Sequence, residues 1–244
     1  VGITEALIDT AQPLNGLEAT DGGTHWFGSP SVLFSNDDLG KPGETLGYMI
    51  EARRILPALD AEIEQQDHLT RIAPAKFIGL ETSPDGVTVL VDNDIKIPAQ
   101  LGAGCDGVNS AVREAVGISV EGRSYGKSVF AADVELDRPH KGIARQLFTP
   151  EGPFATLPLT GTRANLAWYM KTGAAETLAE QDTAAIEAEL NSRFADFAGQ
   201  MKLISKPIAY PLHMKIAERM IEDRVALIGD AAHRINPLAG QGLN

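Results

Sequence analysis

The chain has 244 residues, and its 33 Asp and Glu residues outnumber its 21 Lys and Arg residues, which gives a formal net charge of −12. This balance argues against a nucleic-acid-binding protein, whose contact surface carries an excess of basic residues. With 43% hydrophobic and 22% charged residues, the composition is that of an ordinary globular protein with a sizeable core. The sequence holds no run of about 18 apolar residues, which argues against a membrane-spanning helix. The single cysteine, Cys105, excludes an intramolecular disulfide and favours a reducing, cytoplasmic location.

The two ends of the chain predict a piece of a longer protein. The sequence opens with Val1-Gly2-Ile3 and has no initiating Met. It stops at Gly240-Gln241-Gly242-Leu243-Asn244, where the pattern predicts that a helix is just beginning.

The first third of the chain predicts a few short elements. Residues 1–45 are rich in Gly and turn residues, which predicts loops with short strands only near 24–27 and 32–34. Apolar residues at helical spacing then predict a helix over 51–66. An antiparallel pair is expected at 76–81 and 87–91, around a Ser-Pro-Asp-Gly turn. Residues 95–105 are expected to form one further strand, with Pro98 at an edge or a bulge.

The middle of the chain predicts a mostly antiparallel sheet. The strands expected in it share alternating or β-branched patterns and lie at 128–135, 143–148, 155–159, 164–169 and 203–210. A helix over 183–197 carries Ile186, Leu190 and Phe194 on one stripe, which would cover one face of that sheet. The last part is expected to return to alternating elements, with a helix near 214–220 and a buried strand at 224–228. The sequence thus predicts a sheet domain inserted into an α/β domain.

One segment that stands out runs from Gly104 to Arg113. A strand ends there, Asp106-Gly107 forms a turn, and a helix begins with Asn109 or Ser110 as its N-cap. The helix start offers backbone N–H groups to an anion, and Arg113 could add a charged contact to phosphate. The alternative is a plain strand–turn–helix junction with a surface Arg, and spacing alone favours that alternative.

The other segment that stands out runs from Arg224 to Asn244. A buried strand delivers Asp230 at its carboxyl end, where open α/β sheets bind ligands. A carboxylate between Gly229 and Ala231 suits a hydrogen bond from a ribose or ribityl hydroxyl. The loop 237–242 then leads into a helix start, whose partial positive charge would stabilise negative charge on a bound ring. A simple tight turn is the less favoured alternative here, because several polar or Gly positions converge on one helix start.

These residues resemble a known family, the flavin-dependent aromatic hydroxylases of the para-hydroxybenzoate hydroxylase fold. The run from Cys105 to Arg113 is similar to the family's Asp-Gly motif, which contacts FAD and the nicotinamide cofactor. The run from Gly229 to His233, with 237–244 after it, is similar to the Gly-Asp motif, which binds the FAD ribose. The ubiquinone-biosynthesis hydroxylases are the most similar branch, on segments 46–51, 144–148, 157–159 and 210–212.

The resemblance implies a mixed α/β (α+β) fold. A partial Rossmann-like FAD- and NAD(P)-binding domain would occupy 1–124 and 213–244, and a mostly antiparallel substrate-binding sheet domain would be inserted at 125–212. Family members begin with a strand–Gly-x-Gly-x-x-Gly–helix unit and end with long helices, and neither feature occurs in this sequence.

The resemblance also implies cofactors and site residues. FAD would be the cofactor and NAD(P)H the reductant, with Asp230 on the ribose or ribityl hydroxyls and the loop 237–242 at the flavin ring. Arg53, beside Ala52, would stand in for an Arg that the family carries before this helix. The implied catalytic residues are Pro237, Gly240 and Gln241. The implied cofactor-binding residues are Asp106, Gly107, Arg113, Gly229, Asp230, Ala231, Pro237, Gly240, Gln241, Gly242, Asn244 and Arg53.

In the implied reaction, reduced flavin and O2 form a C4a-hydroperoxide that hydroxylates an aromatic ring. The expected substrate is a polyprenylated phenol or benzoquinol of ubiquinone biosynthesis. Two alternatives stay open: a soluble aromatic acid or polyketide as substrate, or a catalytically empty fragment that acts as an assembly module. Expected partners are the inner-membrane surface by peripheral contact, a biosynthetic complex, and a second copy in a homodimer.

Other candidate residues carry two interpretations. His233 could act as a base on the phenol, but pairing with the backbone is the more common role. The aromatic residues of the sheet could line a channel for a polyprenyl tail, although simple core is the more common role; they are Phe130, Phe148, Phe154, Trp168 and Tyr169. The remaining histidines show no metal-ligand spacing, so no metal site is predicted.

Overall fold

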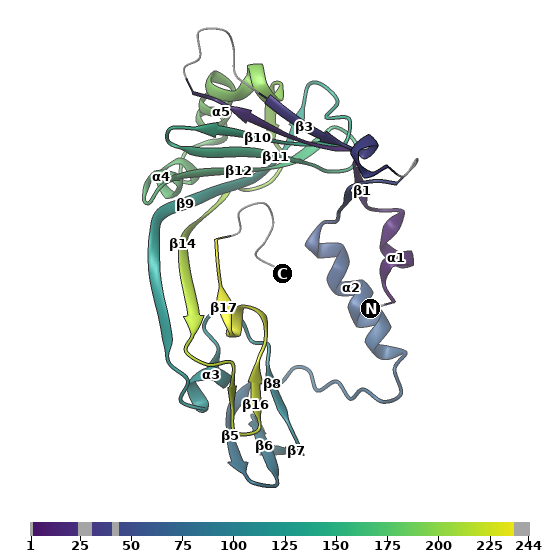
Figure 1. The fold of residues 1–244 in the computed structure, drawn as a ribbon, viewed down its shortest axis with the longest axis vertical. Coiled ribbons are helices and arrows are strands. Elements are labelled where there is room, and N and C mark those ends of the chain that lie inside the picture. The colour runs from purple at the N-terminus through teal and green to yellow at the C-terminus, as the bar shows by residue number, and fades with distance from the viewer. Residues whose placement is uncertain (1, 24–30, 41–43, 237–244) are drawn as a thin grey trace. The chain divides into compact units, whose positions relative to one another are not determined.

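The computed structural model describes residues 2–23, 31–40 and 44–236, and the chain forms two compact units. The first unit contains 1–69 and 126–211, and the second contains 70–125 and 212–244. Strands β9 (Val120–Leu136) and β14 (Ile208–Ala217) carry the chain between the units (Figure 1). Residues 1–69 therefore belong to the same unit as the middle sheet. The division into cofactor-binding and substrate-binding parts stays a prediction.

A large sheet dominates the first unit. The meander of β9, β12 (Arg163–Lys171), β11 (Gly152–Pro158) and β10 (Ile143–Thr149) is antiparallel throughout. Strand β2 (Gly16–Asp21) then pairs with β10 in parallel, and β3 (Ser31–Ser35) pairs antiparallel with β2. The short strand β13 (Met201–Leu203) pairs with β9. The expected antiparallel sheet is confirmed.

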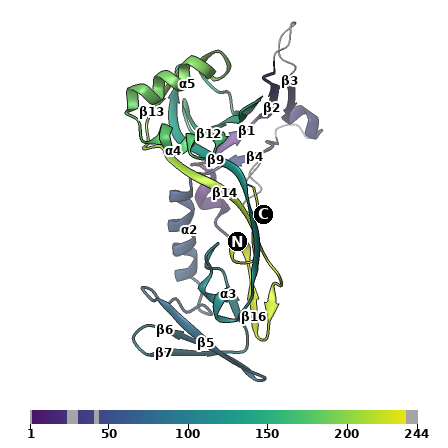
Figure 2. The same ribbon diagram turned by 90° about the vertical axis from the view of Figure 1, so that its left-hand side faces the viewer.

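Two helices cover one face of this sheet. In β11 and β12 every second side chain is buried, because successive residues of a strand point to opposite faces. The buried set packs under α4 (Ala174–Ala179) and α5 (Thr183–Ala198), the second of which was expected (Figure 2). The Phe154 ring stacks on Phe194 with centroids 3.8 Å apart, and Trp168 meets Phe194 edge-on at 4.9 Å.

The aromatic residues of the sheet therefore divide between its two faces. Phe130, Phe154 and Trp168 are fully buried in the helix-covered core, so they do not line a channel. Phe148 is 46% exposed, and Tyr169 is partly buried. Tyr169 follows Trp168 directly in β12, so it lies on the opposite face, which is called the second face below.

The rest of the first unit is built from chain that was expected to be mostly loop. It contains α1 (Thr4–Ile8) and the antiparallel pair β1 (Gln12–Leu14) and β4 (Gly47–Met49). Strand β3 matches the strand expected near 32–34, and a 3-10 turn, η1 (Asn36–Leu39), follows it. The strand expected near 24–27 lies outside the described residues. Helix α2 (Ala52–Glu64) matches the predicted helix, and none of its side chains is buried.

The second unit contains two small sheets. Strands β5 (Phe77–Ser83), β6 (Gly86–Val91) and β7 (Ile95–Ala99) form an antiparallel sheet, as expected for the first two. Strand β16 (Val225–Leu227) lies between β15 (Ile221–Glu222), antiparallel, and β8 (Gly102–Gly104), parallel. Helix α3 (Ala111–Ala115), the 3-10 turn η2 (Gly229–Ala231) and β17 (His233–Arg234) complete the unit.

Three expected elements were wrong, because tertiary pairing overrides local pattern. Residues 95–105 form two strands in different sheets, β7 beside β6 and β8 beside β16. Residues 203–210 also divide, because β13 ends at Leu203 and β14 begins at Ile208. The helix expected near 214–220 is strand instead, since β14 runs to Ala217 and pairs there with β17. None of the helices in the described ranges is long and apolar enough to span a bilayer.

A buried histidine fixes the connection between β9 and β10. His140 is 7% exposed, its Nδ1 accepts the Gly142 N–H at 2.9 Å, and its Nε2 lies 2.9 Å from the Leu159 carbonyl oxygen. Since one contact supplies a donor and the other an acceptor, the neutral ring with its proton on Nε2 satisfies both. This side chain therefore joins the β9–β10 loop to the residue that follows β11.

Replacing this histidine should lower stability. We expect His140→Ala to reduce the free energy of unfolding by about 1–3 kcal/mol, because two main-chain groups lose their buried partner. Urea unfolding followed by tryptophan fluorescence measures the change. His68 is exposed, and His68→Ala should change stability by less than about 0.5 kcal/mol. Equal effects of the two substitutions would contradict the role of His140.

Candidate functional site

The two motifs singled out in the sequence meet at the ends of a parallel strand pair in the second unit. The register of β8 and β16 places Gly104 opposite Leu227, and the Ile228 N–H donates to the Gly104 carbonyl at 2.9 Å. Strands β8 and β16 run side by side (Figure 1). Asp106 follows the end of β8, and Asp230 follows the end of β16. Segments more than 100 residues apart in the chain therefore end side by side at the carboxyl edge of one sheet, the usual ligand edge of parallel sheets.

Glycines allow the close approach and the sharp turns at this edge. A Cβ atom on Gly104 would lie 2.9 Å from Val112 Cγ1 and 3.1 Å from Leu227 Cδ2, so β8 could not pack as it does with a larger residue. Gly107 and Gly229 have φ values of +83° and +61°, which residues with a Cβ atom rarely adopt. Each turn therefore depends on its glycine for backbone conformation.

Asp106 and Ser110 organise the turn after β8. Asp106 Oδ1 accepts the Ser110 hydroxyl at 2.5 Å, and Oδ2 accepts the Val112 N–H at 3.0 Å. Ser110 is fully buried and accepts the Arg113 N–H at 2.9 Å, so Ser110, not Asn109, is the N-cap of α3. Burial raises the pKa of Asp106, but the bonds from Ser110 and Val112 lower it more, and the net pKa lies below its usual value. Asp106 is therefore a carboxylate that holds its own turn.

Arg113 joins the two turns. Its side chain is 5% exposed; NH1 donates to the Ala231 carbonyl at 2.9 Å and NH2 to the Val108 carbonyl at 3.2 Å. Its Nε is buried without a hydrogen-bond partner. The expected surface Arg was wrong, and both terminal nitrogens of this guanidinium bind main-chain oxygens.

The turn after β16 leaves its carboxylate accessible. Ala231 is fully buried, whereas Asp230 is partly exposed and Gly229 is exposed. His233 lies in β17 opposite Ile216, so its backbone is part of a strand pair. The candidates Pro237, Gly240, Gln241, Gly242 and Asn244 lie outside the described residues.

Arg53 belongs to the first unit, at the start of α2. It donates to Glu51 Oε1 from Nε at 3.1 Å and from NH2 at 2.8 Å, and its side chain is 69% exposed. Arg163, at the start of β12, donates to both oxygens of the same carboxylate at 3.3 Å. Burial raises the pKa of Glu51, but Arg163 and Arg53 lower it more, and the net pKa lies below its usual value. Glu51 thus connects α2 to the sheet.

The sequence analysis missed two of these interactions. One is the pair of hydrogen bonds that links Asp106 to Ser110 and Ser110 to Arg113. The available signal for it was an Asp followed four residues later by a Ser at a helix start. The other is the pair Glu51–Arg163, whose members are 112 residues apart, and no local pattern points to it.

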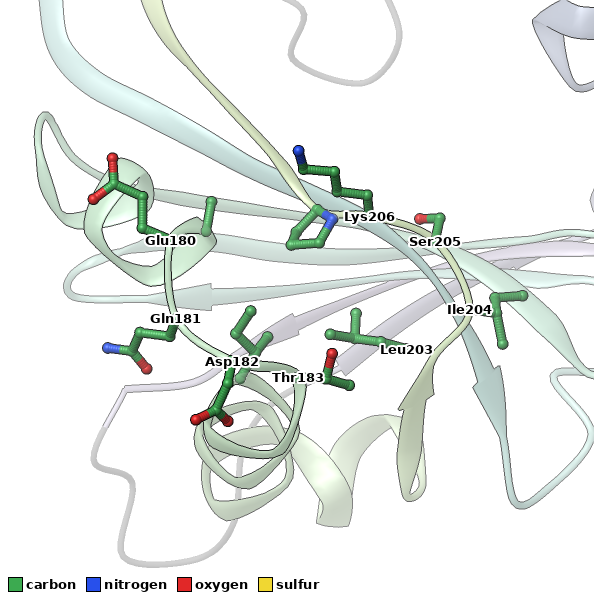
Figure 3. Close-up of a pocket in the computed structure, with 11 residues that line it drawn as sticks. Glu180, Gln181, Asp182, Thr183, Leu203, Ile204, Ser205 and Lys206 are labelled. Atoms are coloured by element: carbon green, nitrogen blue, oxygen red, sulfur yellow. The ribbon is translucent and has the colours of Figure 1, made fainter.

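A cavity of about 820 Å³ lies elsewhere, between the α4–α5 junction and the β13–β14 loop (Figure 3). Leu203 and Thr183 point toward each other there, whereas Glu180 and Lys206 extend outward. None of the candidate site residues that the structure describes lines this cavity. Among the described residues, no three His, Cys, Asp or Glu side chains gather as metal ligands would.

Comparisons with known proteins agree with this arrangement. The chain is 33% identical over 244 residues to the ubiquinone hydroxylase UbiL of Rhodospirillum rubrum, covering 100% of this chain and 55% of that protein. It is 34% identical over 213 residues to the 3-demethoxyubiquinol 3-hydroxylase of Escherichia coli, covering 87% of this chain and 54% of that protein. The chain thus spans about half the length of these relatives.

The fold agrees as well. The flavin-dependent monooxygenase PieE, solved in complex with FAD and substrate, superposes with a TM-score of 0.73 at 19% identity, over 100% of this chain and 45% of that one. The parallel pair with its two motif turns and the mostly antiparallel large sheet are both features of an FAD-binding flavoprotein monooxygenase fold. The FAD binding domain family matches residues 1–244, and the chain belongs to that family.

The geometry of Arg113 predicts a specific loss on substitution. We expect Arg113→Lys to lower the free energy of unfolding by about 1–3 kcal/mol, since an ammonium keeps the charge but cannot reach both carbonyls with a planar fork. Chemical unfolding of the protein with and without the substitution measures this. Arg123 is exposed on β9, and Arg123→Lys is the matched control, expected to change stability by less than about 0.5 kcal/mol.

The lowered pKa of Glu51 predicts a pH-dependent loss. At pH 7 we expect Glu51→Gln to cost about 1–2 kcal/mol, because Arg163 and Arg53 lose a charged acceptor. A carboxyl whose pKa is lower in the folded state contributes stability above its unfolded pKa of about 4.3 and loses it as the pH falls through the folded value. The difference between the two proteins should therefore shrink below about pH 4.

Thermal unfolding from pH 3 to pH 8 tests this dependence. Glu64 is exposed at the end of α2, and Glu64→Gln should give a small difference at every pH. A constant difference for Glu51→Gln over the same range would show that its charge does not carry the effect.

Proposed function

We propose that this chain forms the cofactor turns and the substrate sheet of an FAD-dependent monooxygenase that hydroxylates the ring of a polyprenylated phenol or benzoquinol in ubiquinone biosynthesis. The carrying observation is the parallel pair β8–β16, whose two following turns hold Asp106 and Asp230 and are tied together by Arg113. Membership of the FAD binding domain family and the names of the relatives support the same function.

The described residues fit an FAD at the carboxyl edge of β8 and β16. Gly229 leaves the volume beside it empty, with nothing within 4 Å of a Cβ built there, and Asp230 next to it is partly exposed. We assign Asp230 to accept hydrogen bonds from ribose or ribityl hydroxyls. The carboxylate of Asp106 is occupied by its own turn, so we assign Asp106 and Gly107 to shape the loop that contacts the cofactor.

Arg113 has a positioning role in this proposal. Its guanidinium holds the Ala231 carbonyl, so it fixes the turn that carries Asp230. Within the described part of the chain no carboxylate forms an ion pair with Arg113, and its buried positive charge therefore favours an anionic ligand nearby. We assign Arg53, exposed at the start of α2, to a charged contact with the cofactor.

When bound, FAD supplies electron transfer from NAD(P)H and the activation of O2. This chain's residues orient the cofactor and present the substrate. We assign substrate binding to the second face of the large sheet, since α4 and α5 cover the other face. Because a polyprenylated substrate partitions into lipid, we place the protein at the cytoplasmic surface of the inner membrane, by peripheral contact or within a biosynthetic complex.

An edge strand that has no second partner among the described residues supports contact with a second copy. Strand β3 ends the large sheet, and its Val32, Leu33 and Phe34 are 55%, 53% and 56% exposed. An apolar edge strand without charges is prone to pair with another chain. We therefore propose homodimerisation through β3 as one form of the assembly, and sedimentation of Leu33→Lys against the unchanged protein tests it.

A soluble aromatic acid is the second candidate substrate. Lys171 and Lys127 lie opposite each other in β12 and β9, on the same side as Tyr169. Two ammonium groups at one end of the second face could bind a carboxylate. The polyprenylated phenol remains the first candidate, because the relatives' names refer to ubiquinone compounds.

Asp230 gives the direct test of the cofactor assignment. In the intact protein that contains this chain, Asp230→Ala should weaken FAD binding by about 10- to 100-fold, as expected for the loss of hydrogen bonds to a charged acceptor. Quenching of FAD fluorescence on titration measures the affinity. Glu121→Ala removes an exposed acid of the same unit and should leave FAD affinity unchanged. Equal FAD affinity in the Asp230 variant would remove this residue from the proposal.

A further inference from the structure

We propose that a cleft at the edge of the large sheet binds a phosphate group. The cleft has a volume of about 560 Å³ and lies between strands β2, β3 and β10, the loop from β9 to β10, and the C-terminal end of α5. Arg138, Lys141 and Arg145 supply three cations to its lining, and Glu18 and Asp196 supply two carboxylates. All five residues belong to the first unit, and none is a candidate cofactor residue, so the inference stands apart from the proposed function.

Arg145 is the cation that the sheet itself supplies. Leu147, two residues further along β10, packs in the helix-covered core, so Arg145 lies on that same face. The parallel register places Glu18 opposite Arg145, whose Nε donates to Glu18 Oε2 at 2.7 Å. Glu18 Oε1 accepts the Ser31 hydroxyl at 3.3 Å. Glu18 therefore has partners on both oxygens, whereas the terminal nitrogens of Arg145 have none in the described part of the chain, although its side chain is only 20% exposed.

Lys141 extends from a loop whose backbone is held in place. Its φ of +57° is one that residues with a Cβ atom rarely adopt. Asn15 Nδ2 donates to the Lys141 carbonyl at 3.0 Å, and His140 Nδ1 accepts the Gly142 N–H at 2.9 Å. Within the described ranges the Lys141 ammonium has no acceptor, so its three N–H donors are available to a ligand.

Arg138 comes from the same loop and is anchored on α5. Its NH2 donates to the carbonyls of Ala195 at 3.4 Å and Asp196 at 3.0 Å. Its Nε and NH1 have no partner among the residues that the structure describes. The Asp196 carboxylate lines the cleft but forms no ion pair with any described residue. Asp196 therefore opposes an anionic ligand without neutralising a cation by direct contact.

The three cations repel one another until an anion enters the cleft. The whole chain carries a formal net charge of −12, so three cations beside two carboxylates are a local reversal of its charge. An arginine presents a planar pair of N–H donors that matches two phosphate oxygens, and a lysine adds a point charge. The free donors outnumber the two oxygens of a carboxylate, so a tetrahedral phosphate satisfies more of them. This phosphate is either free in solution or part of a lipid headgroup.

Calorimetric titration with inorganic phosphate tests the cleft in the intact protein that contains this chain. We expect Lys141→Gln and Arg145→Gln each to weaken phosphate binding by about 3- to 10-fold. Asp196→Asn should strengthen it by about 2- to 5-fold, because it removes a negative charge and keeps the carbonyl that Arg138 binds. Lys206 is an exposed lysine outside this cleft, and Lys206→Gln is the matched control with unchanged phosphate affinity.

Two further titrations identify the chemistry of the ligand and its source. Acetate offers a single carboxylate, and we expect it to bind at least about 10-fold more weakly than phosphate. Sedimentation with phosphatidylcholine vesicles, with and without phosphatidic acid, measures binding to a lipid phosphate. Binding that requires phosphatidic acid and that Lys141→Gln weakens would support a headgroup as the source. Binding of inorganic phosphate without binding to either vesicle would support a free ligand.

Four results would overturn the inference. The first is no binding of inorganic phosphate and no preference for vesicles with phosphatidic acid. The second is equal phosphate affinity in Lys141→Gln, Arg145→Gln and the unchanged protein, which would place the phosphate elsewhere. The third is acetate binding as tight as phosphate binding.

The fourth result is weaker phosphate binding in Asp196→Asn, because a loss from every substitution would indicate a structural effect instead of an effect of charge. The thermal midpoint of each variant separates these cases. Lys141 has no side-chain partner to lose among the described residues, so Lys141→Gln should unfold at the temperature of the unchanged protein.

Discussion

The buried guanidinium of Arg113 is the interaction on which the candidate cofactor site depends. A charge removed from water must be compensated by hydrogen bonds, and Arg113 finds two of them on the Ala231 and Val108 carbonyls. These oxygens belong to the turns that follow the two parallel strands. Because the buried cation needs both hydrogen bonds, it holds the turn after β8 and the turn after β16 in a fixed relative position. Ser110 extends the same network to Asp106, so both motif carboxylates sit on a framework that does not rely on loop rigidity alone.

Side chains alternate between the two faces of the large sheet, so one face packs against the helices while the other is the proposed substrate face. In β12, Trp168 enters the aromatic cluster under α5, while Tyr169 lies on the second face. The helix-covered face carries the aromatic core, whereas the second face carries the partly exposed residues of β11 and β12. Ala167, Tyr169 and Lys171 of the same strand lie on the second face. A single strand thus contributes to stability and to the proposed substrate-binding face at adjacent positions.

Polar contacts between residues that are distant in the sequence position the elements that bury few apolar side chains. Helix α2 has no buried side chain, and Glu51 at its start is bound by Arg163 from β12. His140 similarly joins the β9–β10 loop to Leu159 beyond β11. Glu51 binds the guanidinium groups of Arg163 and Arg53, whereas His140 binds two main-chain groups. These contacts explain how segments with few buried apolar side chains keep a defined place within the first unit.

The sequence by itself determined the mixed α/β class, the α2 and α5 helices, the β5–β6 hairpin, the antiparallel middle sheet and the two motifs around Asp106 and Asp230. Each of these features follows from a local hydrophobic periodicity, a set of turn residues or a short motif. Only the tertiary structure decided that residues 214–217 continue a strand, because β17 pairs with them, and that 95–105 divide between two sheets. It also decided that Arg113 is buried and bound to Ala231, 118 residues away. Local sequence patterns indicate the secondary structure and therefore the face on which a side chain lies. The residue that this side chain contacts depends on how distant segments of the chain pack together.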